Sequence, residues 1–299
     1  MLNNLKKTID QLRRENARAY LNRHSAEFLS DYPQMCCYSF DLIATDINLD
    51  GRYEKAVLQF LLEKLPFGDG NVLDVGANIG NHAVAFAGKA RHVFAFEPHP
   101  KTFELLRLNT QSLPNVTAYK VGASDTKATL RAISPKVNFG ASFISDKEAS
   151  DQDSVWTFDV APIDSFPELQ SISVFKLDVE GHEHAALLGA RALLERDKPI
   201  LVFEQHEDVV ENGTTKSVEF LRSLGYAHLY ALDVGMHWKT PQWLPGPLRK
   251  AARLVEGAAI GPADWIATPA AVTTLEQRSY PILIAAPDPL PALAAGSSR

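Results

Sequence analysis

The sequence predicts a doubly wound α/β fold with a mostly parallel sheet, and three short apolar segments carry that prediction. Residues 71–75, 92–97 and 173–177 are apolar runs of strand length, and each is followed by polar residues or glycine. Uninterrupted apolar runs are typical of parallel strands that are buried on both faces. Helical stretches separate these runs, and parallel strands joined by helices are the simplest arrangement that accounts for the alternation. A fourth run at 199–204 extends the same pattern.

Composition places the chain among globular proteins of a reducing compartment. Of its 299 residues 45% are hydrophobic and 22% charged, and the formal net charge of −6 argues against a nucleic-acid partner. The two cysteines, Cys36 and Cys37, are adjacent and cannot join distant segments. We find no signal peptide and no apolar run near the roughly 18 residues of a membrane span. We therefore expect a cytoplasmic protein with no transmembrane segment.

Three regions follow from the pattern along the chain. Residues 1–50 hold a basic amphipathic helix and an extended segment, and the helix could pack on its own domain, on a second subunit of a homo-oligomer or on a membrane surface. Residues 51–269 form the α/β domain. Within it, 126–160 reads as a long polar loop of the kind that often covers a substrate. Residues 270–299 are rich in proline and small residues, which predicts a flexible tail.

A glycine turn follows the first strand and precedes a helix. Gly76 and Gly80 frame the turn directly after Asp74. Glycine allows positive φ or close approach of a ligand to the backbone, and the helix start offers unpaired N–H groups to an anion. We therefore expect a nucleotide-like ligand here. Asn78 stands where a dinucleotide fingerprint has its second glycine, so pyrophosphate binding is disfavoured.

An acidic residue ends the second strand. Glu97 lies one helix after the glycine turn, where a carboxylate in a doubly wound sheet accepts hydrogen bonds from two ribose hydroxyls. The spacing predicts that Glu97 binds a ribose.

Charged residues gather after the third and fourth strands of the pattern. The first group is Lys176, Asp178, Glu180, His182, Glu183 and His184, and the second is Glu204, Gln205 and His206. Ligands of open α/β sheets bind outside the carboxyl ends of the strands, and charges there must pair with each other, with a metal or with a substrate. We expect no metal, but Asp178, Glu180 and Glu204 leave magnesium open as an alternative.

These segments resemble the FkbM family of class I S-adenosylmethionine-dependent methyltransferases over about residues 50–268. The resemblance is carried, in order, by VLDVGANIGNHAVAFA, FAFEPHP, VGASD, FDVAPIDSF, FKLDVEGHEHAALLGA and ILVFEQH. It implies a Rossmann-like sheet of seven strands with the last one antiparallel, and it makes 51–269 the methyltransferase domain. The segment 235–262, which has two tryptophans and several prolines, departs from the family.

The resemblance also implies the site residues. The methionine half of the cofactor falls to Asp74, Gly76, Asn78 and Gly80, the ribose to Glu97, the adenine to Ser124 and Asp125, and the sulfonium to Asp178. The acceptor side falls to Glu180, Glu183 and Glu204 with His182 and His206. Transfer to oxygen needs alignment, exclusion of water and a base for the hydroxyl proton. We take Asp178, His182 and His206 as the catalytic candidates, the two histidines as the bases.

The predicted function is O-methylation of a small-molecule or glycan hydroxyl with S-adenosylmethionine. Two alternatives remain. One is a nucleotide-binding oxidoreductase with a variant glycine turn, and the other is a noncatalytic interaction protein that uses the N-terminal helix and the 235–262 insertion. The acidic residues at several strand ends argue against a noncatalytic protein, because a binding scaffold has no physical need for them.

Overall fold

The structure is a computed structural model. The structure describes residues 35–39, 41, 43, 44, 47, 51–135, 143–144, 153–204, 214–234, 265–269 and 282–294. The predicted N-terminal helix, the insertion at 235–262 and His206 lie outside these residues.

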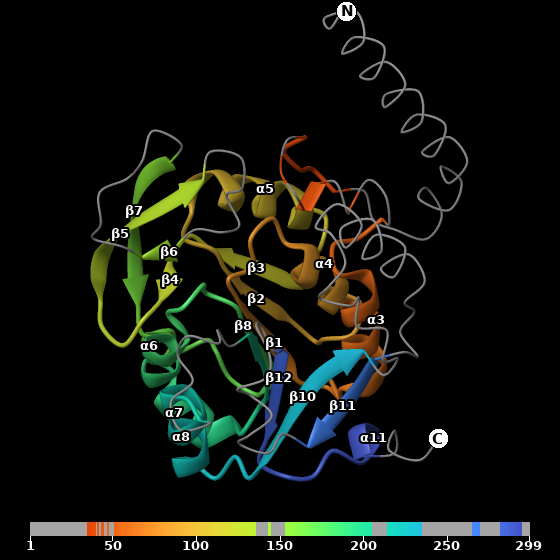
Figure 1. The fold of residues 1–299 in the computed structure, drawn as a ribbon. Coiled ribbons are helices and arrows are strands. Elements are labelled where there is room, and N and C mark those ends of the chain that lie inside the picture. The colour runs from red at the N-terminus through yellow and green to blue at the C-terminus, as the bar shows by residue number, and fades with distance from the viewer. Residues whose placement is uncertain are drawn as a thin grey trace, which may run out of the picture.

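Eight strands of the described chain form the main sheet, in the order β11-β10-β12-β9-β8-β1-β2-β3 (Figure 1). Their bounds are β1 Asn71–Val75, β2 Val93–Phe96, β3 Val116–Tyr119, β8 Ile172–Leu177, β9 Ile200–Glu204, β10 His228–Val234, β11 Trp265–Pro269 and β12 Ile282–Ala286. Neighbours from β9 to β3 pair in parallel. The predicted doubly wound, mostly parallel sheet is confirmed.

The antiparallel strand of the sheet comes from the end of the chain. β12 lies between β9 and β10 and is antiparallel to both, with Leu283 opposite Phe203 on one side and Ala231 on the other. The last strand is therefore antiparallel, as predicted, while β11 adds an eighth strand at the edge. The expectation of a flexible tail over 270–299 is wrong for residues 282–294. The apolar run at 282–286 is short and flanked by prolines, yet Leu283 and Ile284 are fully buried in the sheet.

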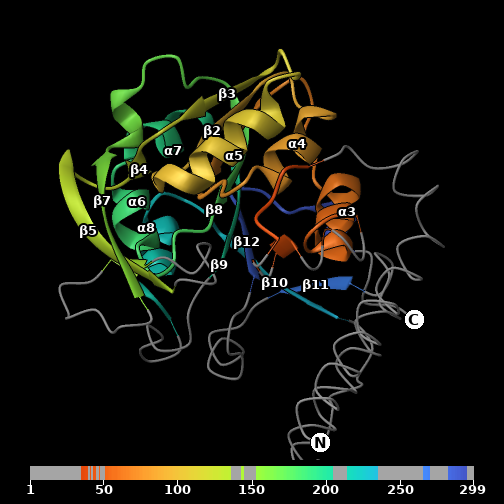
Figure 2. The same cartoon turned by 90° about the horizontal axis from the view of Figure 1, so that it is seen from above.

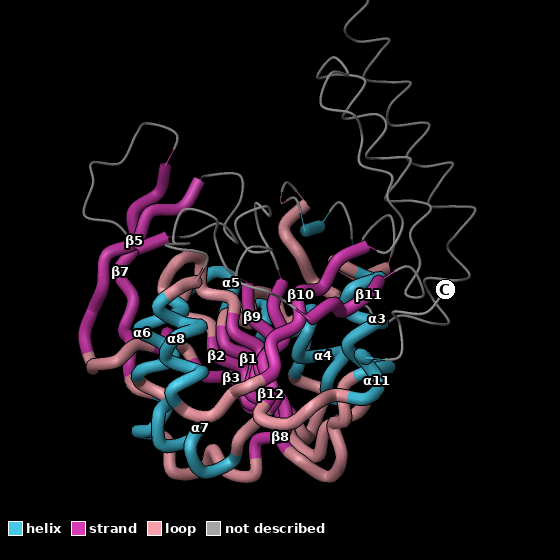
Figure 3. The backbone as a smooth tube through the Cα atoms, turned by 60° about the horizontal axis from the view of Figure 1, so that its bottom comes forward, coloured by secondary structure: helices cyan, strands magenta, loops and turns pink. Residues whose placement is uncertain are grey.

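Helices cover both faces of the sheet. One face carries α3 (Lys55–Lys64), α4 (Asn81–Ala87) and α5 (Pro100–Thr110), and the other carries α6 (Glu183–Leu188), α7 (Arg191–Asp197) and α8 (Lys216–Ser223), as Figures 2 and 3 show. Each face has its own apolar core, with Leu58, Phe86 and Leu106 in one and Leu187 and Leu221 in the other. A short helix, α11 (Pro291–Ala294), follows β12. The two cores fix the sheet, and with it the strand ends that build the site.

A second, smaller sheet replaces much of the polar loop predicted at 126–160. It has the order β4-β7-β5-β6, with β4 Gly122–Ala123, β5 Ala128–Pro135, β6 Phe143–Ile144 and β7 Asp153–Ala161. β5 and β7 pair antiparallel, and Phe158 and Val160 of β7 are buried. The turn residues near 134–142 suggested a loop, but the apolar residues that alternate on β7 stabilise a strand. This sheet supplies one wall of the site.

Candidate active site

Two cavities lie side by side at the carboxyl ends of the parallel strands. The first, which we call the Glu97 cavity, is lined by residues after β1, β2 and β8 together with Phe158 and Val160. The second, the Glu204 cavity, is lined by residues of α3, α4, β8 and β9 and by Ile282. Asn78, Asp178 and Glu180 line both cavities and therefore form the wall between them.

The glycine turn after β1 fits against the turn after β8. Gly76 has a φ of 78°, and a Cβ atom there would overlap the carbonyl oxygen of Asp178. Glycine is required for both reasons, since other residues avoid this φ and have a Cβ. Asn78 and Gly80 also have positive φ, 50° and 93°, and Gly80 precedes the first residue of α4. The turn thus brings the backbone of one strand end directly against the next.

Glu97 is held rigidly at the end of β2. Its Oε2 accepts a hydrogen bond from the backbone N–H of Asn78 (2.9 Å), and its Oε1 accepts from the N–H of His99 (2.7 Å) and the hydroxyl of Thr102 (2.9 Å). Burial raises the pKa of Glu97 to about 7, although these hydrogen bonds and Lys176 act to lower it. The two carboxylate oxygens have four lone pairs, and three of them are used by these bonds, so Oε2 can accept one further bond from a ligand in the Glu97 cavity.

Asn78, in the wall shared by the two cavities, has a hydrogen-bond acceptor without a partner. The side-chain oxygen Oδ1 of Asn78 is buried and has no hydrogen-bond partner in the described structure. A buried polar atom without a partner costs free energy unless a ligand or water supplies one. Asn78 therefore fits a ligand that carries a hydrogen-bond donor, such as an ammonium group.

Lys176 joins the two turns electrostatically. Its Nζ donates to the carbonyl oxygen of Gly76 (3.1 Å) and to Oδ2 of Asp178 (3.3 Å), and it lies 3.5 Å from Oδ1 of Asp74. Burial lowers the pKa of Lys176, but Asp178, Asp74 and Glu54 outweigh burial and raise it. Burial raises the pKa of Asp74, and Lys176 opposes that rise. Asp74 lines neither cavity and acts on the site through Lys176.

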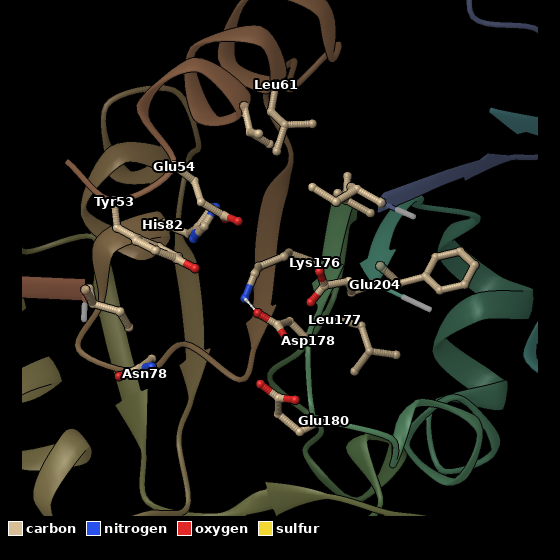
Figure 4. Close-up of a pocket in the computed structure, with 15 residues that line it drawn as sticks. Tyr53, Glu54, Leu61, Asn78, His82, Lys176, Leu177, Asp178, Glu180 and Glu204 are labelled. Carbon is tan, nitrogen blue, oxygen red and sulfur yellow. Dashed lines mark hydrogen bonds and ion pairs between the residues drawn. The ribbon is translucent and has the colours of Figure 1, made fainter. Parts of the chain in front are cut away.

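The Glu204 cavity gathers carboxylates. Figure 4 shows the side chains of Lys176, Asp178 and Glu204 converging from β8 and β9, with Glu54 and His82 on the α3 and α4 side. Burial raises the pKa of Glu204 to about 8, and the negative charges of Asp178, Glu54 and Glu180 add to the rise. A carboxylate with a pKa near neutral is suited to accept a proton from a substrate.

His82 is neutral in this cavity. It lies at the start of α4 with Nε2 3.8 Å from Oε2 of Glu54. Burial and the charge of Lys176 lower its pKa well below the usual value. It can exchange hydrogen bonds with a ligand without adding a positive charge.

The residues predicted for the acceptor side do not all line the same cavity. His182 lines the Glu97 cavity, where its Nε2 lies 3.0 Å from the hydroxyl of Ser124, and it is absent from the lining of the Glu204 cavity. Glu183 is buried and accepts from the N–H of Gly181 at the start of α6, so it stabilises that turn. Only Glu180 and Glu204 of the predicted acceptor-side carboxylates line the Glu204 cavity.

Neither Ser124 nor Asp125, the residues predicted near the adenine, lines the Glu97 cavity. Their neighbours Gly122 and Ala123 line it, while Ser124 is buried and Asp125 is exposed. The side-chain contact between Ser124 and His182 ties this strand end to the turn after β8.

Two residues that line the Glu204 cavity, Glu54 and His82, were not among the predicted site residues. Glu54 precedes α3, outside every motif, and only the fold brings it to the cavity. His82 did carry a signal, since it lies two residues after Gly80, and the helix start that the turn creates directs it inward.

Metal and membrane features are limited in the part of the chain that is described. Those residues include no group of three or more histidine, cysteine, aspartate or glutamate side chains arranged to hold a metal ion, so the magnesium alternative at Asp178, Glu180 and Glu204 has no support. Asp178 pairs with Lys176 instead. None of the described helices has the length and hydrophobicity to cross a membrane.

The sheet order, the glycine turn after β1 and the carboxylate after β2 define the class I methyltransferase fold. The family model described as the methyltransferase FkbM domain matches residues 74–227, and the chain belongs to this family. The resemblance seen in the sequence is thereby confirmed.

The chain is also similar to individual proteins. The chain is 33% identical over 169 residues to the hexuronic acid methyltransferase AglP of Haloferax volcanii, which covers 56% of this chain and 68% of AglP. The crystal structure of methyltransferase FkbM from Methylobacillus flagellatus is 19% identical, with a TM-score of 0.41, over 71% of this chain and 55% of that chain. Precorrin-6y C5,15-methyltransferase from Geobacter metallireducens is 15% identical, with a TM-score of 0.40, over 77% of this chain and 88% of the other.

Proposed function

We propose that this protein is an S-adenosylmethionine-dependent O-methyltransferase whose acceptor is a hydroxyl of a sugar, free or within a glycan. The observation that carries the proposal is the pair of cavities that share the wall of Asn78, Asp178 and Glu180. One cavity has the carboxylate expected for a ribose and the other has a carboxylate suited to act as a base. The name of the relative AglP, a hexuronic acid methyltransferase, supports a sugar acceptor.

The residues of the Glu97 cavity fit the methyl donor. When bound, S-adenosylmethionine supplies a methyl group on a positively charged sulfur. Oε2 of Glu97 retains one lone pair that can accept a hydrogen bond from a ribose hydroxyl, and the unpartnered Oδ1 of Asn78 can accept one from the ammonium group. Asp178 and Glu180 offer negative charge to the sulfonium from the shared wall. Phe158 and Val160 supply apolar surface beside Ala123 for the adenine end.

The residues of the Glu204 cavity perform the acceptor's part of the reaction. A sugar hydroxyl must lose its proton as its oxygen is methylated, and Glu204 takes that proton. With a pKa of about 8 it is ionised in a useful fraction of molecules near neutral pH, yet basic enough to hold the proton. Holding the methyl donor and the acceptor hydroxyl in line where the two cavities adjoin can lower the activation barrier by on the order of 7–11 kcal/mol. His206, next to the end of β9, stays a second candidate base from the sequence.

Calorimetric titration of the purified protein tests the donor. We expect S-adenosylmethionine and S-adenosylhomocysteine to bind, NAD not to bind, and Glu97→Ala to weaken the binding of the first two at least tenfold, because hydrogen bonds to a charged group contribute about 1.5–3 kcal/mol. Binding of NAD alone would favour the oxidoreductase alternative. Binding of none of the three would favour a noncatalytic protein.

A further inference from the structure

The charge of the Glu204 cavity bears on whether its sugar ligand can be negatively charged. Among its described lining residues four carry carboxyl groups, Glu54, Asp178, Glu180 and Glu204, and one, Lys176, carries a permanent positive charge. The described part of the cavity wall therefore carries more negative than positive charge.

Lys176, the lysine among the described lining residues, is not available to bind an anionic ligand. Lys176 is buried, and its ammonium group already lies within 3.5 Å of carboxylate oxygens on Asp74 and Asp178 and donates to the carbonyl of Gly76. A ligand carboxylate that approached Lys176 would also approach Asp178, and like charges in a partly desolvated site repel strongly. His82, the other basic side chain in the lining, is held neutral by burial and by Lys176.

Part of this acidity cannot be assigned to the methyl donor. Asp178 and Glu180 also line the Glu97 cavity, where the positive charges of the donor would balance them. Glu54 and Glu204 line only the Glu204 cavity. Even with Glu204 protonated, the carboxyl group of Glu54 still lines the acceptor side.

Apolar side chains complete the cavity. Val57 and Leu61 of α3, Val202 of β9 and Ile282 of β12 line it. They lower the local dielectric and strengthen the preference that the carboxylates impose. Tyr53 adds an aromatic ring, whose face suits the apolar C–H face of a sugar ring.

We infer that the sugar methylated by this protein carries no negative charge, so that it is a neutral or amino sugar rather than a uronic acid. The inference rests on the proposed function and refines its acceptor. It separates this chain from AglP, whose name specifies a hexuronic acid.

Three probes that differ in one substituent test the inference. Methyl glucoside, methyl glucosaminide and methyl glucuronide are titrated against the full chain saturated with S-adenosylhomocysteine, and their dissociation constants are measured by ligand-observed NMR. We expect the glucuronide to bind at least tenfold more weakly than the other two, with the difference shrinking in high salt. Glucuronide binding as tight as that of the glucoside, or no binding by any probe, would overturn the inference.

A pair of variants locates the effect. Glu54→Gln removes a charge that lines only this cavity and should narrow the gap between glucuronide and glucoside several-fold. Glu63→Gln makes the same charge change at an exposed position of α3 and should leave the gap unaltered. The proposed function itself fails in a different way, through loss of S-adenosylhomocysteine binding, so the two failures are distinguishable.

Discussion

The ammonium group of Lys176 lies 3.5 Å from the carboxylate of Asp74 in a place where the two side chains are 8% and 0% exposed. Asp74 is the residue before the last of β1, Lys176 belongs to β8, and the two are opposite one another in the parallel register. This buried ion pair therefore stands directly beneath the wall that separates the two cavities. Lys176 also donates to Oδ2 of Asp178, so the pair helps to position that carboxylate.

Replacing Lys176 should destabilise the fold. Lys176→Met leaves the carboxylate of Asp74 buried without its counter-charge, which we expect to lower the free energy of unfolding by about 3–5 kcal/mol. Adding Asp74→Asn should recover much of that loss. The measurement is urea unfolding at pH 7. As a control, Arg191→Met breaks an exposed pair with Glu195 and should cost less than about 1 kcal/mol. If Lys176→Met and Arg191→Met lower the free energy of unfolding equally, the buried pair contributes no more to stability than the exposed one.

Gly76→Ala should disrupt the site and the fold together. The new Cβ would overlap the carbonyl of Asp178, and the φ of 78° would be strained as well. Gly68→Ala is the matched control, because its φ of 55° imposes the conformational cost of about 1–2 kcal/mol while its Cβ meets no atom within 4 Å. We expect Gly76→Ala to lose S-adenosylhomocysteine binding and to unfold at a lower temperature than Gly68→Ala. If the two variants behave alike, the close approach of the turns is not what requires glycine.

Donor binding should weaken as the pH falls through 7. In the free protein burial raises the pKa of Glu97 from 4.5 to about 7. Ribose hydroxyls donate to the ionised form and favour it, so binding below pH 7 requires the carboxyl to lose its proton. The dissociation constant for S-adenosylhomocysteine should rise about tenfold from pH 8 to pH 6. Calorimetry on Glu97→Gln should show weaker binding without this dependence. The same slope in that variant would assign the titration to another group.

Glu204→Gln should slow methylation and leave donor binding intact. Loss of a general base costs about 10²–10⁴-fold in kcat. Because the base works in its ionised form and its pKa is raised to about 8, the wild-type rate should climb with pH and level off above 8. The assay is methyl transfer to whichever probe sugar is accepted, with Glu63→Gln as the control for charge. An unchanged rate would transfer the role of base to another residue, with His206 the first to test.

The fold was predictable from the sequence wherever hydrophobic periodicity was unambiguous. The strands β1, β2, β8 and β9 are mostly apolar, and the glycine turn after β1 has a specific physical cause. β12 was not predictable in the same way, because five apolar residues between prolines resemble a linker in the sequence. Only the fold shows that they pair with β9 and β10. β5 and β7 were obscured by turn-forming residues between them.

The candidate site divides similarly. Gly76, Asn78, Glu97 and Asp178 belong to local motifs, and the structure brings them to one cavity. Glu54 reaches the neighbouring cavity only through the packing of α3, and no spacing along the chain indicates that. His182 lies three residues before Ala185 on the turn into α6, and the direction of that turn, which sequence does not specify, places it beside Ser124.

The two cavities differ in where their residues fall along the chain. Among the described residues, all those that line the Glu97 cavity lie between 75 and 182, inside the segment 74–227 that matches the family. Six residues of the Glu204 cavity fall outside that segment: Ile43, Tyr53, Glu54, Val57, Leu61 and Ile282. If the Glu97 cavity holds the methyl donor, as proposed, membership of the family supports the donor site and much less the acceptor site. Substitutions in α3 and β12 would then alter which molecule is methylated and leave the residues of the donor site unchanged.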